Sequence, residues 1–205
     1  MTSTEDTRLR ALLDTLFAAH PWHGIDPGDP AGVMTAYIEI VPTDAVKYEL
    51  DKQSGALRID RPHRSSSLAP MPYGFVPQTY CGTSVAARCA ERTSSGPVEG
   101  DHDPMDVCVL TEKPLEHGGF LARVRPIGGL RMIDGNEADD KIVAVLENDL
   151  AWGALRELTD CPPESSSAWA LLPDLQTDPR RREAENPTNQ VGREEPRTRP
   201  GSSGV

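Results

Sequence analysis

The strongest constraint on the fold is a series of short stretches in which apolar and polar residues alternate. Between residues 34 and 61 these stretches are MTAYIEIVP, VKYELD and GALRIDR, separated by the turn-like sequences PTDA and KQSG. Alternation with a period of two is typical of β-strands with one buried face. LARVRPIGGLRMI (121–133) and DKIVAVLEN (140–148) continue the pattern. Several short strands with little helix between them favour a mainly β fold, a compact antiparallel barrel.

Three parts of the chain differ in pattern. Residues 5–18 place leucines and a phenylalanine at helical spacing, and the Pro- and Gly-rich stretch after them cannot continue a helix. We therefore expect 1–33 to form an amphipathic N-terminal helix and a lead-in, and 34–160 to form the barrel domain. Within that domain, residues 81–100 read as a polar surface loop and 152–160 as the start of a short flanking helix.

The tail, residues 161–205, has a different composition. It holds seven of the 19 prolines and shows no sustained periodicity. Such a composition predicts a segment that is disordered.

The charge of the chain restricts its partners. It carries 21 Lys and Arg against 32 Asp and Glu, a net charge of −11. Nucleic acids and anionic membranes both need a basic surface, so we expect neither as a partner. No apolar run approaches the ~20 residues of a membrane span, and the N-terminus lacks the pattern of a signal peptide. The four cysteines have no zinc-type spacing, so we expect reduced thiols and a cytoplasmic protein.

Acidic residues are concentrated at the ends of the predicted strands. GDHDPMDVCVL places Asp101, Asp103 and Asp106 directly before an apolar run. Carboxylates this close repel one another unless solvent, basic side chains or a cation compensates them. Further charged residues fall at other strand ends, and alternation in a closed barrel would direct several of them to one mouth. These are Glu39, Lys47, Glu49, Arg61, Asp134, Asp139, Asp140 and Lys141.

The mixture of acids and bases indicates a metal site with a second, anionic occupant. Clustered carboxylates suit Mg²⁺, a hard cation that prefers oxygen ligands. Lys and Arg are not metal ligands, and together with Mg²⁺ they suit phosphoryl transfer. A calcium-binding EF-hand fits poorly, because DHDPMD has its third acid at position 6 and a proline within the loop.

Four ordered motifs together resemble the soluble family I inorganic pyrophosphatases. They are VKYELDKQSGALRIDR, PYGFVPQTYC, GDHDPMDV and RMIDGNEADDK, and the similarity extends from about Ala36 to Leu146. The resemblance implies a five-stranded barrel of the oligonucleotide-binding (OB) type. It also implies hydrolysis of pyrophosphate to two phosphates with several Mg²⁺ ions, and an assembly of identical subunits.

The resemblance also implies roles for single residues. Asp103 would orient or deprotonate the attacking water. Glu49 would steady metal-bound water. The metal ligands would be Asp101, Asp106, Asp134, Asp139 and Glu39, and the phosphate oxygens would be held by Lys47, Arg61, Tyr73 and Lys141.

One departure from the family pattern concerns the tail. The family continues after the barrel with a helix that carries a Tyr-Lys pair on the product-side phosphate, and no tyrosine follows Tyr80 here. Synonymous codons can be chosen for ALLPDLQTDP (170–179) so that the frame one base later encodes His-Tyr-Phe-Arg-Thr-Tyr-Lys-Leu-Ile. We therefore hypothesise a slip of the reading frame between about residues 160 and 168, and the alternative is a natural, divergent tail.

Two other functions remain open at this point. The first is a catalytically impaired protein of the same barrel that binds metal or phosphate without turnover. The second is an oligonucleotide-binding module, because the barrel type also serves that role. The negative charge and the 5% of aromatic residues disfavour the second.

Overall fold

The computed structural model describes residues 8–9, 19–63, 68–93 and 96–162. Apart from residues 8 and 9, the predicted helix at residues 5–18 lies outside the described residues. The predicted disordered or frame-shifted tail lies outside them too, beyond residue 162.

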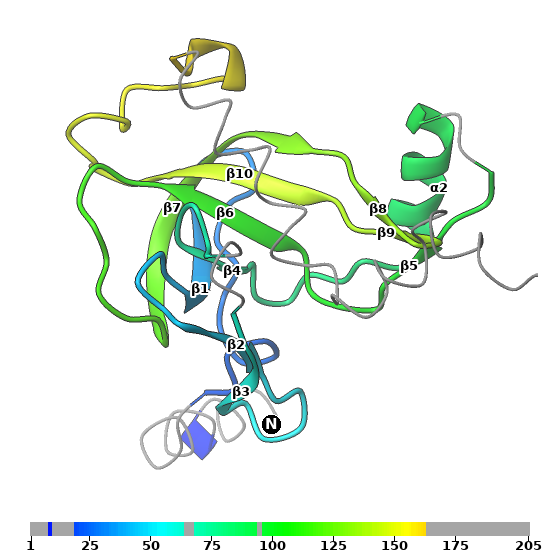
Figure 1. Cartoon of the computed structure of the whole chain (residues 1–205), viewed down its shortest axis with the longest axis horizontal. Coiled ribbons are helices and arrows are strands. Elements are labelled where there is room, and N and C mark those ends of the chain that lie inside the picture. The colour runs from blue at the N-terminus through cyan, green and yellow to red at the C-terminus, as the bar shows by residue number, and fades with distance from the viewer. Residues whose placement is uncertain (1–7, 10–18, 64–67, 94–95, 163–205) are drawn as a thin grey trace, which may run out of the picture. The chain divides into compact units, whose positions relative to one another are not determined.

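Five strands close into a barrel in the described part of the chain (Figure 1). The barrel closes because the first strand pairs with the fourth on one side and with the seventh on the other. This arrangement confirms the predicted closed five-stranded barrel. In order around the barrel the strands are β1 (Met34–Ile40), β4 (Tyr73–Phe75), β6 (Asp106–Leu110), β10 (Lys141–Leu146) and β7 (Phe120–Leu130).

One pair of barrel strands departs from the antiparallel arrangement that we expected. β6 and β10 run parallel, with Asp106 opposite Lys141, whereas the other four pairings are antiparallel. The prediction of a wholly antiparallel barrel was wrong, because alternation identifies the faces of a strand and not the direction of its partner. The parallel pairing brings the first residues of β6 and β10 together at one end of the barrel.

The second and third predicted strands are not part of the barrel. β2 (Val46–Leu50) and β3 (Leu57–Pro62) form a separate antiparallel hairpin, seen below the barrel in Figure 1. The prediction that they continue one meander was therefore wrong. Lys47 lies opposite Arg61 but Tyr48 lies opposite Ile59, so Asp60 is an extra residue on β3. Such a bulge redirects side chains locally.

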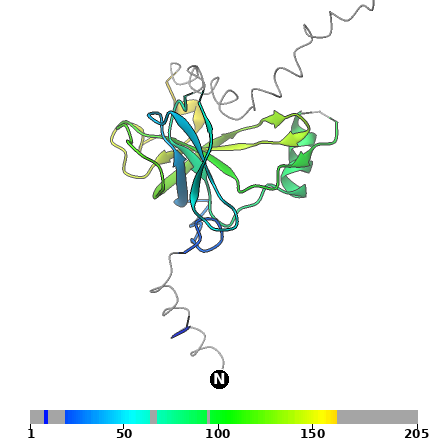
Figure 2. The same cartoon turned by 60° about the horizontal axis from the view of Figure 1, so that its bottom comes forward.

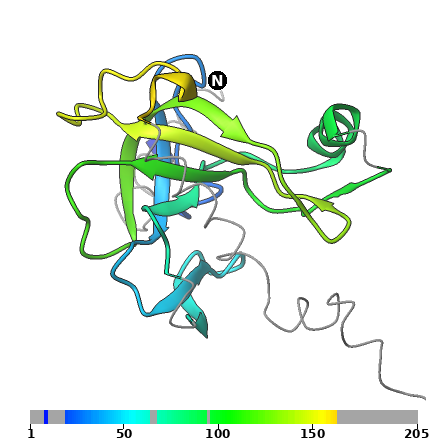
Figure 3. The same ribbon diagram turned by 45° about the horizontal axis from the view of Figure 1, so that its top comes forward.

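A helix replaces the surface loop that we expected between residues 81 and 100. α2 (Thr83–Thr93) buries Ala86 and Cys89 against Cys81 and Ala138. The prediction was wrong because two small buried residues make too weak an apolar stripe to mark a helix. α2 lies beside a small sheet of β5 (Glu99–Gly100), β9 (Glu137–Ala138) and β8 (Ile133–Asp134), beyond the barrel (Figures 2 and 3).

The flanking helix expected at residues 152–160 is a series of turns that ends in one 3₁₀ turn, η1 (Leu158–Asp160). Trp152, Leu155 and Leu158 nevertheless pack against the barrel core. In the described part of the chain no helix has the length and apolar character needed to cross a membrane.

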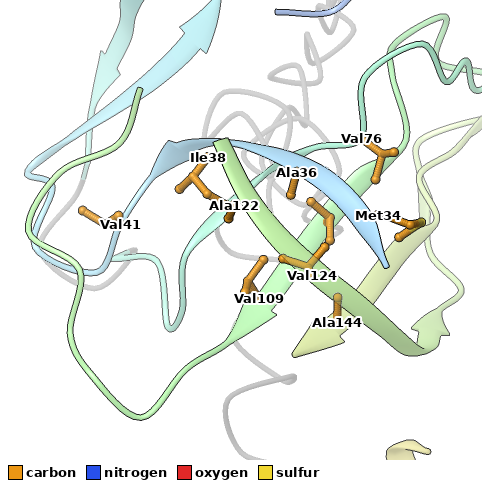
Figure 4. Close-up of a cluster of buried hydrophobic side chains, with 10 residues drawn as sticks. Met34, Ala36, Ile38, Val41, Val76, Val109, Ala122, Val124 and Ala144 are labelled. Carbon is orange, nitrogen blue, oxygen red and sulfur yellow. The ribbon is translucent and has the colours of Figure 1, made fainter. Parts of the chain in front are cut away.

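Both faces of β6 are buried, which explains the continuous apolar run VCVL. Val107 and Val109 join Ala36, Ile38 and Val124 in one cluster, shown in Figure 4. Cys108 points to a second cluster, which contains Ile40, Met71, Tyr73, Val143 and Val145. Cys108 has no exposed surface and packs as a small buried hydrophobic residue.

Candidate active site

Four neighbouring strands of the barrel each contribute one polar residue to the same region. Glu39 lies on β1, Tyr73 on β4, Asp106 on β6 and Lys141 on β10. Register explains the gathering: Ile40 pairs with Tyr73, and Asp106 pairs with Lys141. Polar residues in a barrel that is otherwise filled with apolar side chains are expensive unless they are paired, so they indicate a functional site.

Lys141 is the central cation of this cluster. Its side chain has no exposed surface, and its Nζ donates to Asp106 Oδ2 at 2.7 Å and also to Asp139 Oδ1. Nζ also lies 5.9 Å from the centre of the Tyr73 ring. Burial by itself would lower the pKa of Lys141, but the two aspartates outweigh burial and raise it. The ammonium group therefore remains charged.

The partners of Lys141 are themselves poorly solvated. Burial raises the pKa of Asp139 to about 6, although Lys141 acts in the opposite direction. Burial also raises the pKa of Tyr73, and the nearby Asp106 carboxylate adds to that effect. The phenol of Tyr73 is therefore a neutral hydrogen-bond donor at ordinary pH.

Glu39 connects the barrel to the β2–β3 hairpin. Its Oε1 accepts a hydrogen bond of 2.7 Å from the backbone N–H of Leu50, and the residue is 8% exposed. The pKa of Glu39 is raised to about 8, mainly by burial and also by the charges of Asp106 and Glu49, while the hydrogen bond from Leu50 and the charge of Lys47 act in the opposite direction. Since burial and the neighbouring carboxylates outweigh Lys47, the charged form of Glu39 would gain from a further cation.

The loop between β5 and β6 carries the other two aspartates of the motif. Asp101 Oδ1 accepts a hydrogen bond of 2.9 Å from the N–H of Asp103, and the intervening His102 has a φ of 65°. Burial raises the pKa of Asp101, and the charges of Asp106 and Asp103 add to the shift. The carboxylate of Asp103 contacts the ammonium group of Lys52.

The β2–β3 hairpin supplies a group of partly exposed bases. Lys47 Nζ lies 3.7 Å from Glu49 Oε1 and 3.5 Å from Asp60 Oδ2, and Arg61 Nε lies 3.5 Å from the same Asp60 oxygen. Lys47 and Glu49, two residues apart on β2, therefore share one face of the hairpin. Arg58 adds a further contact to Glu49, at 3.2 Å.

Asp134 lies on β8, opposite Glu137 of β9, in the small sheet beside α2. Of the eleven predicted site residues it is the one whose strand lies outside both the barrel and the hairpin. The sequence could not show this, because RMIDGNEADDK reads as one turn between two apolar strands.

The donor set fits a hard divalent cation by its chemistry. Glu39, Asp101 and Asp139 are carboxyl groups whose pKa burial and mutual repulsion raise, so each would gain from added positive charge. Among the described residues no three acidic, imidazole or thiol side chains converge on one point. Instead, Lys141 contacts Asp106 and Asp139, and Lys52 contacts Asp103.

Two residues of the site, Lys52 and Asp60, were not predicted from the sequence. Lys52 lies in the KQSG turn, and a turn lysine gives no signal of its partner. Asp60 bridges Lys47 and Arg61, whereas strict alternation puts Asp60 and Arg61 on opposite faces. The bulge at Asp60 removes that alternation.

The barrel gathers Glu39, Asp106, Lys141 and Tyr73, and the adjoining hairpin adds further lysines and arginines. Carboxylates combined with such bases are typical of enzymes that use a metal for phosphoryl transfer. The sequence profile described as Inorganic pyrophosphatase matches residues 36–170. The chain therefore belongs to the inorganic pyrophosphatase family, as its motifs predicted.

Relatives and solved structures agree. Inorganic pyrophosphatases of Chlamydia muridarum and Chlamydia caviae are 47% and 49% identical over 148 and 149 residues. These matches cover 72% of this chain in both cases, and 71% and 69% of the two relatives. The structure of an inorganic pyrophosphatase from Coxiella burnetii matches with a TM-score of 0.56 at 31% identity, covering 80% of this chain and 84% of that one.

Proposed function

We propose that this chain hydrolyses inorganic pyrophosphate to two orthophosphates and that Mg²⁺ is its metal. The observation that supports the activity most directly is the cluster built from four adjacent barrel strands, Glu39, Tyr73, Asp106 and Lys141, in a chain of this family. Its carboxylate oxygens favour Mg²⁺ over softer metals.

The metal would be held by the carboxylates in and around this cluster. When bound, Mg²⁺ lowers the pKa of water and neutralises charge on phosphate oxygens. The buried, mutually repelling acids of the site support this assignment. The ligands that we propose are Asp101, Asp106, Asp134, Asp139 and Glu39, with Glu49 steadying bound water.

The chain's own residues would do the remaining work. Asp103 would accept the proton of the attacking water at its carboxylate. The water oxygen forms a bond to one phosphorus, the bond from the bridging oxygen to that phosphorus breaks, and the electron pair stays on the leaving phosphate. Lys47, Arg61 and Lys141 would bind the phosphate oxygens with charge, and Tyr73 would donate a neutral hydrogen bond.

We also propose that the protein is located in the cytoplasm and that it assembles into a homo-oligomer. Cys81, Cys89 and Cys108 are free and buried thiols, which suits a reducing compartment.

Phosphate release from pyrophosphate, measured with Mg²⁺ and with excess chelator, tests the function. We expect release that requires Mg²⁺ and falls at least about a hundredfold in Asp103→Asn, since a positioned base contributes about 10²–10⁴-fold. Asp29→Asn is the matched control, because Asp29 is an exposed loop residue whose Oδ1 accepts only a local hydrogen bond from Ala31.

The same experiment separates the enzyme from the impaired protein. A folded chain that binds Mg²⁺ in calorimetry but releases no phosphate would contradict the proposed activity. Equal activity in Asp103→Asn and Asp29→Asn would leave the activity standing and remove Asp103 from its role.

A further inference from the structure

A cavity of about 590 Å³ lies between α2 and the adjoining ends of β7 and β10. Arg88 and Arg92 of α2 line it, and so does Arg131, which directly follows β7. The other charged lining residues are Asp140 and Lys141. The lining of this cavity is therefore positively charged, whereas the chain as a whole has a net charge of −11.

Asp140, the acid among the described residues that line the cavity, is already neutralised by Arg131. Nε and Nη2 of Arg131 donate to Asp140 Oδ2 at 3.1 and 2.8 Å, and Nη1 donates to the carbonyl oxygen of Arg88 at 3.0 Å. This bidentate pair fixes the wall of the cavity. The charge of Arg88 and Arg92 is therefore in excess.

Arg88 and Arg92 share one face of α2. They are four residues apart, and both are exposed. Within the part of the chain that the structure describes, neither guanidinium group pairs with an acid. Like charges at this spacing destabilise a helix, and a bound anion would remove the repulsion.

The cavity is separate from the carboxylate cluster but adjoins it. Met105 lies between Asp103 and Asp106 in the sequence and lines the cavity, as does Lys141. The remaining lining residues include Leu130 and Ile142 and none of the proposed metal ligands. The cavity volume is within the range of small-molecule sites. It exceeds the volume that a single phosphate group fills.

We propose that this cavity binds a condensed inorganic phosphate longer than pyrophosphate, held by the guanidinium groups of Arg88 and Arg92. Guanidinium groups bind phosphate oxygens with two parallel hydrogen bonds, and two of them suit a chain of phosphates better than a single group. This inference goes beyond the proposed function, and its test does not depend on turnover.

Calorimetric titration with tripolyphosphate in excess chelator tests the site. Without metal, the carboxylate cluster repels anions and turnover is suppressed. We expect the double variant Arg88→Ser, Arg92→Ser to bind at least about tenfold more weakly than the unaltered chain. The double variant Lys113→Ser, Arg123→Ser is the matched control, because it also removes two exposed cations, each from a surface ion pair, and it should bind within about twofold of the unaltered chain.

Three outcomes would overturn the proposal: no binding by the unaltered chain, equal weakening in both double variants, or equally tight binding of citrate. If Arg88→Ser, Arg92→Ser fails to fold by circular dichroism, Arg88→Lys, Arg92→Lys replaces it. That variant keeps the positive charge but loses the planar guanidinium groups and their paired hydrogen bonds. It should bind tripolyphosphate several-fold more weakly than the unaltered chain. Asp103→Asn should bind tripolyphosphate normally, so failure of this site and failure of the proposed hydrolysis give different results.

Discussion

Lys141 pairs with two aspartates at once, the buried Asp139 and the half-buried Asp106. Its ammonium group contacts Asp106 and Asp139 and has no exposed surface. Removing one partner of a buried ion pair leaves uncompensated charge in a poorly solvated place, which is strongly destabilising. Lys141 therefore has a structural role as well as the proposed role on phosphate.

Lys141→Met tests this structural role. We expect the free energy of unfolding in chelator to fall by about 3 kcal/mol, because the two aspartates lose their cation. Mg²⁺ should recover part of the loss, since it supplies positive charge to the same carboxylates. Urea unfolding with and without Mg²⁺ measures both effects.

The control for Lys141→Met is Lys113→Met, because the Lys113 side chain is 75% exposed and its ion-pair partner among the described residues is the neighbouring Glu112. Its stability should stay within about 0.5 kcal/mol of the unaltered chain. Equal stability of both variants in chelator would show that the pairs around Lys141 contribute nothing.

Single site residues could be predicted from the sequence where they lie on a strand that the alternation of apolar and polar residues marks clearly. Asp106 and Lys141 begin strands that alternation marks clearly, and the structure pairs them. Lys52 and Asp60 were missed because a turn and a bulge determine their partners. Both are local irregularities that a regular period does not reveal.

At the scale of elements, alternation located β1, β7 and β10 but did not identify which strands pair. β2 and β3 alternate as well as β1 does, yet they form a separate hairpin. β4 has only three residues and shows no period, although it connects β1 to β6. Neighbours in a barrel are set by packing between distant segments, which a single sequence does not contain.

Gly74 makes the close contact of β4 with β1 possible. It lies opposite Ile38, and a Cβ atom at this residue would lie 1.9 Å from the carbonyl oxygen of Tyr37. Gly74→Ala must therefore push β4 away from β1 and shift Tyr73 beside it. We expect a loss of roughly 3 kcal/mol or more in the free energy of unfolding, measured by urea unfolding.

Gly96→Ala is the control for the Gly74 variant, because a Cβ atom there meets nothing within 4 Å. It should leave stability nearly unchanged. A Gly74→Ala chain as stable as the Gly96→Ala chain would show that β4 can move without loss, and would contradict the tight pairing seen here.

At the scale of the whole molecule, the Tyr-Lys pair that the family pattern places after the barrel bears on the proposed site. The last described residues stay close to the site: Trp152, Leu158 and Cys161 pack against the cluster that contains Tyr73. Cys161 therefore lies beside the core that contains Tyr73, one of the residues that we propose to bind phosphate. We propose that the reading frame slipped between about residues 160 and 168, and that the shifted frame encodes the Tyr-Lys pair of the family.

A chain that carries the shifted-frame product from about residue 168 onward tests this proposal. We expect its kcat/KM for pyrophosphate to exceed that of the present chain by roughly thirtyfold to ten-thousandfold, because the added tyrosine and lysine each donate to phosphate oxygens, worth about 1–3 kcal/mol apiece. The control is the same product with Phe-Met in place of Tyr-Lys, which keeps the apolar surface and removes both donors. If control and restored chain have equal kcat/KM, the pair does not act on phosphate. If the DNA contains no frame that encodes Tyr-Lys there, the tail is natural and the carboxylate cluster operates without the pair.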